Sequence, residues 1–311
     1  MNRIGTNSIP FEWWVAPDGY QLEGPDMTLI SARDPSLAQL SYKNREKFRA
    51  YKPFADFTGL FRTFAGLDLT PESVLAFTNR YGLLGESYTP EEPTTISMKT
   101  PENWPGNSKP AFVSGISVPA FRRMPENVSG PSEPTIWPRP YEPLEVWFHH
   151  IKLMKRSVEI WDAVQSDDRR WLRKHIRWPG LQACVEISMH SYNATIASYK
   201  LHPHLLPIIN EDSRKAAAVF LQTNVNEQLK GRTGPALLFN DDDALELFNR
   251  PNTLIGAMWL QFALAISGNR EYAECAWCGT QFDVSAYRKG KKTCSDSCRN
   301  LLSRSKNKKR K

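Results

Sequence analysis

Cysteine is scarce in most of this chain. Of its five cysteines, only Cys184 precedes position 275. A secreted disulfide scaffold needs many more paired cysteines. The N-terminus also lacks the basic segment followed by an apolar run that marks a secretory signal. We therefore expect a protein of the reducing cytoplasm.

Long hydrophobic runs are missing as well. The most apolar stretch begins at Asn252 or Thr253 and covers about fifteen residues, whereas a helix that crosses a bilayer needs about twenty. The sequence has no Walker A loop, dinucleotide glycine pattern, His-Glu-x-x-His or nucleophile elbow. We expect neither a membrane protein nor an enzyme; an enzyme that uses some other motif stays a third hypothesis.

The six histidines give no catalytic pattern. Glu186 and His190 are four residues apart, so on a helix they could pair as acid and base or bind a metal. Isolated pairs of this kind are usually structural contacts. The other histidines have no ligand spacing, and no catalytic residue is predicted.

The C-terminal segment, in contrast, is rich in cysteine. Cys275 and Cys278 are separated by two residues and Cys294 and Cys298 by three, with fifteen residues between the pairs. Two close pairs of thiolates predict one tetrahedral zinc site. Four thiolates leave no position for water, so the zinc is expected to be structural. Metal binding would supply much of the folding free energy of so small a finger.

The residues around these ligands predict a treble-clef finger. Gly279 allows a tight turn after the second cysteine. Alternation over residues 281–284 predicts a short strand with Phe282 as the small inner core, in a hairpin whose turn is formed by residues 288–292. The second cysteine pair shares one face of a helix that begins near Ser295, a favourable N-cap residue.

Positive charge is concentrated in the same segment. Residues 286–311 contain eleven Lys or Arg and one acidic residue, a charge of +10; the whole chain carries +7, so residues 1–285 carry the difference, −3. A basic stripe is the electrostatic footprint of phosphate binding. The residues predicted to bind nucleic acid are Arg288, Lys289, Lys291, Lys292, Arg299, Arg304, Lys306, Lys308, Lys309, Arg310 and Lys311. The alternatives are a solvated tail that aids solubility or, in a nucleated cell, an import signal.

The pattern Cys-x-x-Cys-Gly-x-x-Phe, a basic turn, then Cys-Ser-x-x-Cys-Arg resembles the C-terminal treble-clef fingers of many bacterial proteins, including the CGNR-type zinc fingers. The residues that carry the resemblance are Cys275, Cys278, Gly279, Phe282, Cys294, Ser295, Cys298 and Asn300. Arg299 and Leu301 stand where that family has glycine and arginine, and the last cysteine pair is one residue closer. The resemblance implies a helical domain followed by the finger, in a DNA-binding transcriptional regulator. Residues 73–85 also resemble helical domains of bacterial proteins with this layout.

Residues 1–88 are expected to begin the helical domain. Phe11–Val15 and Tyr20–Leu22 are typical of two strands of a hairpin around a turn at residues 17–19.

Residues 37–64 interleave basic and aromatic side chains, a composition that can bind single strands. Their apolar spacing instead favours an amphipathic surface helix. Thr70 and Pro71 then begin a core helix that runs to about Tyr81 and ends at Gly82.

Residues 89–143 contain twelve of the twenty-three prolines, which prevents a long helix and predicts an extended insert or linker. Residues 144–269 are expected to form the helical core. Apolar residues recur at steps of three and four after Pro143, and further helices are predicted from Ser213 and from residue 252 or 253. Residues 169–177 form a second basic face.

Together these features predict a mainly α-helical protein. A helical domain, interrupted by the proline-rich insert, precedes a finger over residues 270–304 and a basic tail over residues 305–311. Our first hypothesis is a regulator whose finger and tail bind nucleic acid, DNA rather than RNA, while the helical domain binds a small-molecule effector or a protein partner. The alternative is a protein-interaction or scaffold protein in which the finger is purely structural. No residue pattern sets the oligomeric state.

Overall fold

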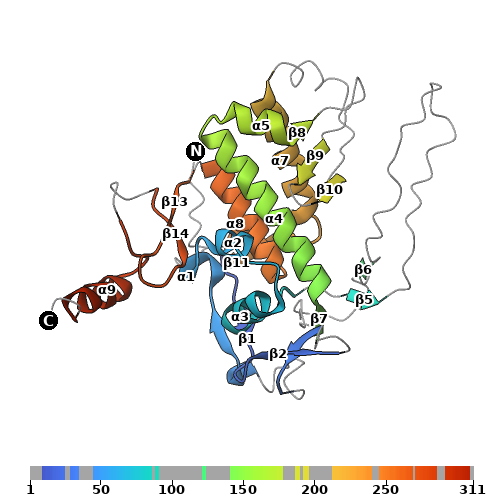
Figure 1. The fold of residues 1–311 in the computed structure, drawn as a ribbon. Coiled ribbons are helices and arrows are strands. Elements are labelled where there is room, and N and C mark those ends of the chain that lie inside the picture. Colours follow the sequence, from blue (N-terminus) through green and yellow to red (C-terminus); the bar gives the residue numbers. More distant parts are fainter. Residues whose placement is uncertain are drawn as a thin grey trace. The chain divides into compact units, whose positions relative to one another are not determined.

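Helices account for more of the described residues than strands do (Figure 1). The computed structural model describes residues 9–24, 29–34, 45–85, 88–90, 121–123, 141–177, 186–189, 192–195, 212–239, 245–268, 270–285 and 291–308. Within these ranges the helices are α1 (Pro53–Asp56), α2 (Leu60–Ala65), α3 (Pro71–Tyr81), α4 (Leu144–Gln165), α5 (Arg169–His175), α7 (Ser213–Leu229), α8 (Leu254–Gly268) and α9 (Asp296–Lys308). The chain is mainly helical, as its sequence predicts.

The described strands are short and form small antiparallel sheets of two or three strands. They are β1 (Trp13–Val15), β2 (Tyr20–Glu23), β3 (Leu29–Ala32), β4 (Arg49–Tyr51), β5 (Tyr88–Pro90), β6 (Phe121–Arg123), β7 (Tyr141–Pro143), β8 (Ile176–Arg177), β9 (Glu186–Met189), β10 (Tyr192–Thr195), β11 (Thr233–Phe239), β12 (Leu245–Pro251), β13 (Tyr272–Glu274) and β14 (Gln281–Asp283).

The chain divides into two compact units. One comprises residues 1–85 and 134–311, and the other comprises residues 86–133. In the smaller unit, β5 and β6 pair with each other. Most of the proline-rich segment 89–143 lies outside the described residues.

The two N-terminal strands form where they were expected, but they do not form a hairpin. β1 pairs with β4, and β2 pairs with β3, which in turn pairs with β7. The turn itself is present: the Gly19 amide donates to the Ala16 carbonyl at 3.1 Å, and Gly19 has a φ of 77°. Alternation and turn chemistry are local signals, whereas the partner that a strand takes depends on the segments packed beside it.

The prediction of a single amphipathic helix over residues 37–64 is wrong. Residues 37–44 lie outside the described part. The rest of the segment contains four short elements: a 3₁₀ turn at Arg45–Lys47, strand β4, helix α1 and helix α2. Pro53 explains part of the break, because proline fits the first turn of a helix but not its interior. The apolar spacing did identify buried side chains, including Phe54, Leu60 and Phe64.

Helix α3 confirms the prediction from its caps. The Thr70 hydroxyl accepts a hydrogen bond from the Ser73 amide at 3.2 Å, Pro71 is the first helical residue, and Gly82 follows the last one with a φ of 91°. Val74 and Phe77 are buried on its inner face.

The core is built around α2, α4, α7 and α8. Trp147 and Ile151 of α4 are fully buried, as the spacing after Pro143 predicts. Helix α8 is buried over most of its length, and the Gln261 amide on it donates to the carbonyls of Pro53 and Phe57, both at 2.9 Å. The Gln261 side chain therefore joins helix α8 to the N-terminal part of the chain.

Two helix starts can be compared with their predicted positions. The hydroxyl of Thr253 accepts the Gly256 amide at 3.0 Å at the start of α8, as expected. Helix α7 is capped by Asp212, not by Ser213, because the Asp212 carboxylate accepts the Arg214 amide at 2.9 Å.

Glu186 lies in strand β9, so the helical pairing of Glu186 with His190 is wrong; His190 is outside the described residues. Side chains alternate across a strand and do not repeat every four residues on one face.

The β11–β12 hairpin was not predicted from the sequence. None of the described helices is long and apolar enough to cross a membrane.

Candidate metal centre

A tight turn between β13 and β14 carries the first two cysteines. The strands pair from Tyr272 opposite Asp283 to Glu274 opposite Gln281. Between them, the Cys275 amide donates to the Thr280 carbonyl at 3.0 Å, and the Gly279 amide donates to the Cys275 carbonyl at 2.9 Å. Gly279 has a φ of 69°, which an L side chain rarely adopts. The turn therefore needs glycine at this position, as the sequence predicts.

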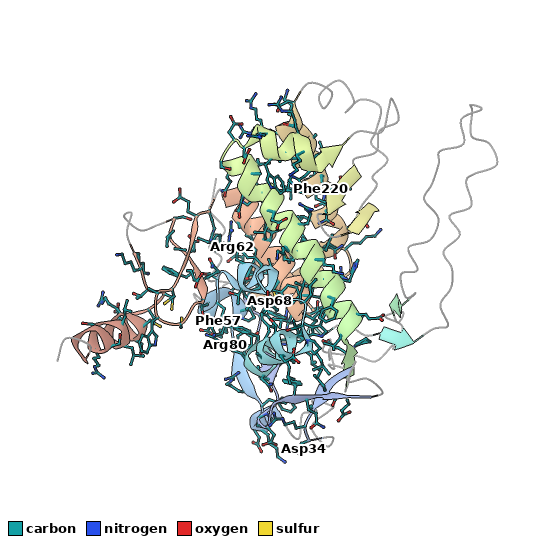
Figure 2. All side chains as sticks on the ribbon, viewed as in Figure 1. Asp34, Phe57, Arg62, Asp68, Arg80 and Phe220 are labelled. Carbon is teal, nitrogen blue, oxygen red and sulfur yellow. The ribbon has the colours of Figure 1, made fainter. Side chains whose placement is uncertain are left out.

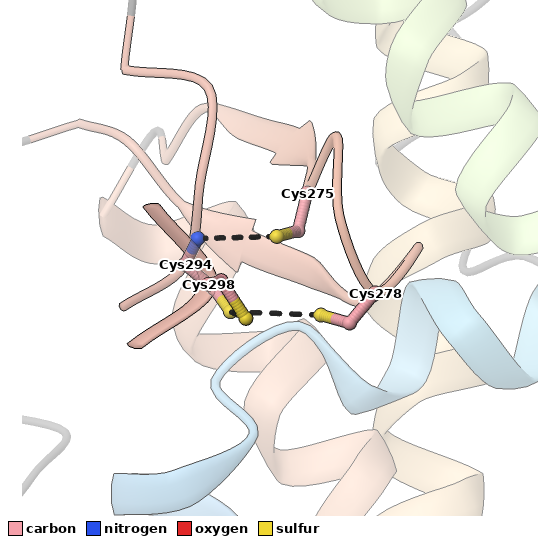
Figure 3. Close-up of side chains that lie close together, drawn as sticks. All are labelled: Cys275, Cys278, Cys294 and Cys298. Atoms are coloured by element: carbon pink, nitrogen blue, oxygen red, sulfur yellow. Dashed lines mark hydrogen bonds between the residues drawn. The ribbon is translucent and has the colours of Figure 1, made fainter. Parts of the chain in front are cut away.

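The four cysteine sulfurs lie within 4.8 Å of one another (Figure 3). Cys278 Sγ and Cys294 Sγ are 3.7 Å apart, and Cys294 Sγ and Cys298 Sγ are 3.6 Å apart. A disulfide would require about 2.05 Å. In contrast, a tetrahedral ion with metal–sulfur bonds of about 2.3 Å holds its sulfurs about 3.8 Å apart. The cluster could therefore hold one metal ion with four thiolate ligands.

Cys275 is the one residue of the four that is buried, and the other three are half-buried. Burial raises the pKa of this thiol, but amide N–H groups of Cys278, Cys294 and Trp277 oppose that effect and lower the pKa to about 6. The Cys294 amide lies 3.4 Å from this sulfur. Metals bind the thiolate form of cysteine. A site in which one sulfur already favours that form is therefore suited to metal binding.

The pKa of Cys294 moves in the opposite direction, to about 12. Burial is the main cause, and hydrogen bonds with the sulfurs of Cys298, Cys278 and Cys275 add to it. Without a cation, closely packed thiols cannot all ionise, because each new negative charge repels the others. A divalent cation would remove this repulsion, so metal binding and proton release are coupled.

Helix α9 carries the last ligand. The Ser295 hydroxyl accepts the Cys298 amide at 3.2 Å, and the Arg299 amide donates to the Ser295 carbonyl at 3.0 Å. These bonds confirm Ser295 as the N-cap. Because α9 begins at Asp296, Cys298 stands in its first turn, where the capped helix end holds it beside Cys294.

The strand predicted over residues 281–284 is present, and Phe282 on it is buried. Its partner differs from the prediction. The hairpin closes around the cysteine turn and uses β13, which precedes the first ligand; residues 291–295, the described part after the basic turn, contain no strand. The Ala276 amide instead donates to the Lys292 carbonyl at 2.9 Å, which attaches this segment to the cysteine turn.

The finger is docked on the helical core through Arg80, which Figure 2 labels. The Arg80 guanidinium donates to the Thr280 hydroxyl at 3.0 Å and lies 5.1 Å from the ring centre of Tyr81. A second contact involves backbone only. Gly59 approaches β14 so closely that an added Cβ would lie 2.6 Å from the Gln281 carbonyl oxygen.

Strand β13 makes the other half of this interface. The rings of Tyr272 and Phe61 meet edge to face at 5.2 Å, and the Arg62 guanidinium lies 5.3 Å from the Tyr272 ring. Arg62 also binds both carboxylate oxygens of Asp162 on α4, at 2.6 and 3.0 Å. One arginine therefore connects the finger, α2 and α4. No local pattern in the sequence marks these partners, because they are about 100 to 200 residues apart.

The basic residues predicted to bind nucleic acid are only partly described. Arg288, Lys289, Lys309, Arg310 and Lys311 lie outside the described residues. Lys292, Arg299 and Arg304 are exposed, and Lys306 and Lys308 are on the last turns of α9.

Two of the described cations have partners within the finger. Lys291 Nζ lies 5.5 Å from the ring centre of Phe282, and Arg299 forms an exposed ion pair with Asp296 at 3.2 Å. Exposed ion pairs of this kind are worth little and leave the cation accessible.

The second basic face, on α5, is extended by the tertiary structure. Arg169, Arg170, Arg173 and Lys174 are exposed on α5. Arg214 of α7 lies 3.5 Å from Asp167, which also pairs with Arg169 at 3.1 Å. The two contacts with Asp167 neutralise part of the positive charge of this face.

No protein-family model, curated protein or solved structure matches this chain. The resemblance to CGNR-type fingers consequently rests on the residues themselves.

Proposed function

We propose that the chain is a nucleic-acid-binding regulator whose four-cysteine cluster holds one structural zinc ion in a treble-clef finger. The observation that carries the metal assignment is the spacing of the sulfurs, 3.6 and 3.7 Å, which fits the edges of a zinc–thiolate tetrahedron. Four soft thiolate ligands favour zinc over magnesium or calcium, which prefer oxygen.

The position of the basic residues supports nucleic-acid binding. Lys292, Arg299 and Arg304 are exposed on the segment and the helix that carry the second cysteine pair. Metal binding would therefore fix the positions of these cations relative to one another. Cations held at fixed positions can contact phosphates, which sets affinity and register without reading sequence. DNA is the first candidate for the nucleic acid that binds, and RNA is the second.

The test removes charge from the finger in the full-length, metal-loaded protein. Lys292, Arg299 and Arg304 are changed together to alanine, and binding to mixed-sequence DNA and RNA is measured at several salt concentrations. Each lost phosphate contact should reduce the slope of log affinity against log salt by about 0.7–0.9. The matched control changes three exposed cations of α5, Arg170, Arg173 and Lys174, to alanine.

The proposal expects a shallower salt slope for the finger variant and a nearly unchanged slope for the α5 variant. If the wild type with bound zinc shows no salt-dependent binding to either nucleic acid, the proposal is wrong. If only the α5 variant loses binding, the finger is structural and the interface lies on the helical domain.

A second candidate function, protein interaction, is favoured by the β11–β12 hairpin. Leu237, Leu245 and Leu247 are 62%, 59% and 68% exposed, and the pairing of Leu237 with Leu247 places all three on one face. No other described strand pairs with the hairpin. Exposed apolar faces and open strand edges are typical of interaction sites.

In its simplest form the partner is a second copy of the chain. Sedimentation over a range of concentrations would then show self-association that Leu247→Lys abolishes. A monomer at every concentration excludes this form. Leu69→Lys is the control, because Leu69 is an exposed leucine elsewhere.

A further inference from the structure

Trp277 has an unusual position among the aromatic residues of this protein. Its side chain is 42% exposed, and it is the one aromatic among the large exposed hydrophobic side chains of the described residues. Trp13, Trp147 and Trp259 are buried. A single exposed apolar side chain is ordinary on a protein surface, so a role for Trp277 has to follow from where it stands.

The backbone holds Trp277 in place. It stands between Cys275 and Cys278, in a turn that the Gly279 amide closes by donating to the Cys275 carbonyl at 2.9 Å. The residue before it, Ala276, donates its amide to the Lys292 carbonyl at 2.9 Å. With both neighbouring cysteines bound to a metal, the indole would be presented from a rigid turn. A rigid aromatic loses little conformational entropy on binding.

An exposed cation lies on a segment that is hydrogen-bonded to this turn. Exposed Lys292 belongs to the segment hydrogen-bonded to the turn, and exposed Arg299 and Arg304 belong to the helix that carries the fourth cysteine. An exposed aromatic on a turn joined to a cationic segment fits surfaces that bind single-stranded nucleic acid, in which bases stack on aromatic rings and phosphates meet cations.

A duplex does not offer this kind of contact. Its bases are stacked on one another, so an indole can reach a base face only where the strand is unpaired or kinked. We propose that Trp277 stacks on an unpaired base and that the finger prefers single-stranded nucleic acid. This inference rests on the proposed function, because it names the form of nucleic acid that the finger binds.

The test compares three ligands of one mixed sequence: a DNA strand, the matching RNA strand and the DNA duplex. Affinities for the full-length, zinc-loaded protein are measured by fluorescence anisotropy of labelled strands. Trp277→Leu removes the aromatic face but keeps an apolar side chain, whereas Trp277→Phe keeps a smaller aromatic face. Leu69→Ala, which removes an exposed apolar side chain outside the finger, is the control.

We expect at least one single strand to bind more tightly than the duplex. The Trp277→Leu protein should bind that strand about tenfold more weakly than the wild type, because one stacked base is lost. Trp277→Phe should stay within about threefold of the wild type, on the same stacking argument. Duplex affinity and the salt dependence should change little, because no charge is removed. Zinc content is measured for each variant, since a variant that loses zinc reports on folding instead of stacking.

Two results would overturn the inference while leaving nucleic-acid binding intact. One is salt-dependent binding that is equally tight for duplex and single strands. The other is a zinc-loaded Trp277→Leu protein that binds single strands as the wild type does. Failure of the wild type to bind any of the three ligands would instead refute the proposed function itself. The two failures are therefore distinguishable in one experiment.

Discussion

The carboxylate of Glu142 is fully buried in the described core. It accepts hydrogen bonds from the amides of Leu84 and Gly85 at 2.9 and 2.7 Å and from the indole N–H of Trp147 at 2.9 Å. A buried carboxylate is costly unless it is fully hydrogen-bonded, and here three donors satisfy it. This one side chain connects the loop after α3 to the start of α4.

Glu142→Ala should destabilise the protein strongly, because it leaves three buried donors without an acceptor. We expect a loss of about 3 kcal/mol or more in the free energy of unfolding, measured by denaturant titration. Glu227→Ala, at an exposed position on α7, should change it by less than about 0.5 kcal/mol. Equal stabilities of the two variants would contradict the role given to Glu142.

Tyr20 provides a test of pH dependence. Burial raises its pKa to about 12, although the Ala16 amide, which donates to its hydroxyl at 3.1 Å, acts in the opposite direction. The folded state favours the neutral phenol. This contribution to stability is fully present below the unfolded pKa of about 10 and is lost as pH rises from there to 12.

Relative to Tyr20→Phe, the wild type should therefore lose up to about 2–3 kcal/mol of unfolding free energy between pH 10 and pH 12. Denaturant titrations of both proteins across this range measure the difference. Between pH 7 and pH 9 the two stabilities should change in parallel. If the unfolding free energies of the two proteins changed in parallel up to pH 12, burial would not raise the pKa of Tyr20.

At the scale of elements, the finger depends on a close backbone contact. Gly59 stands before α2, and an added Cβ would lie 2.6 Å from the carbonyl oxygen and 2.7 Å from the carbonyl carbon of Gln281 on β14. Neither atom belongs to a flexible side chain, so the strand or the helix would have to move. The contact determines how closely the finger can approach α2.

Gly59→Ala should weaken the docking of the finger by about 1–3 kcal/mol, the usual cost of forcing extra atoms into a packed contact. Limited proteolysis near residues 268–271, which join α8 to β13, should become faster. Gly66→Ala is the control, because its Cβ would meet only the carbonyls of Arg62 and Thr63, at 3.4 and 3.6 Å, and its φ of −83° is ordinary for a helix. Equal proteolysis rates for the two variants would exclude the proposed contact.

At the scale of the whole molecule, the finger and the helical core draw on different sources of stability. The core has many buried apolar side chains, whereas the described finger buries few, chiefly Phe282 and Cys275. A module with so small a core would depend on a bound metal ion in order to fold. The core does not depend on the metal in the same way.

Removal of the metal with a chelator should expose the finger to hydrogen exchange and leave α4, α7 and α8 protected. Zinc should restore protection in β13, β14 and α9. Cys298→Ser should reproduce the effect without a chelator, and Cys184→Ser, at the one cysteine outside the cluster, should not. Persistent protection of β13 and β14 after complete metal removal would show that docking alone maintains the finger.

The sequence by itself determined the features that depend on neighbours along the chain. The caps of α3 and α8, the buried face of α4 and the cap of α9 are local, because a helix bonds each residue to one four positions away. The four cysteines could also be grouped from spacing alone, since each pair is held by one turn or one helix. The Ser295 cap and the short strand around Phe282 are confirmed for the same reason.

Only the tertiary structure decided which distant segments meet. The pairing of β1 with β4, the hydrogen bonds of Glu142 with Leu84 and Gly85, and the contacts of Arg62 and Arg80 with the finger join residues dozens to hundreds of positions apart. A local pattern states that a strand or a cation is present but not what it pairs with, because pairing follows from the packing of the whole core. The exposure of Trp277 is likewise decided by what the remaining chain leaves uncovered.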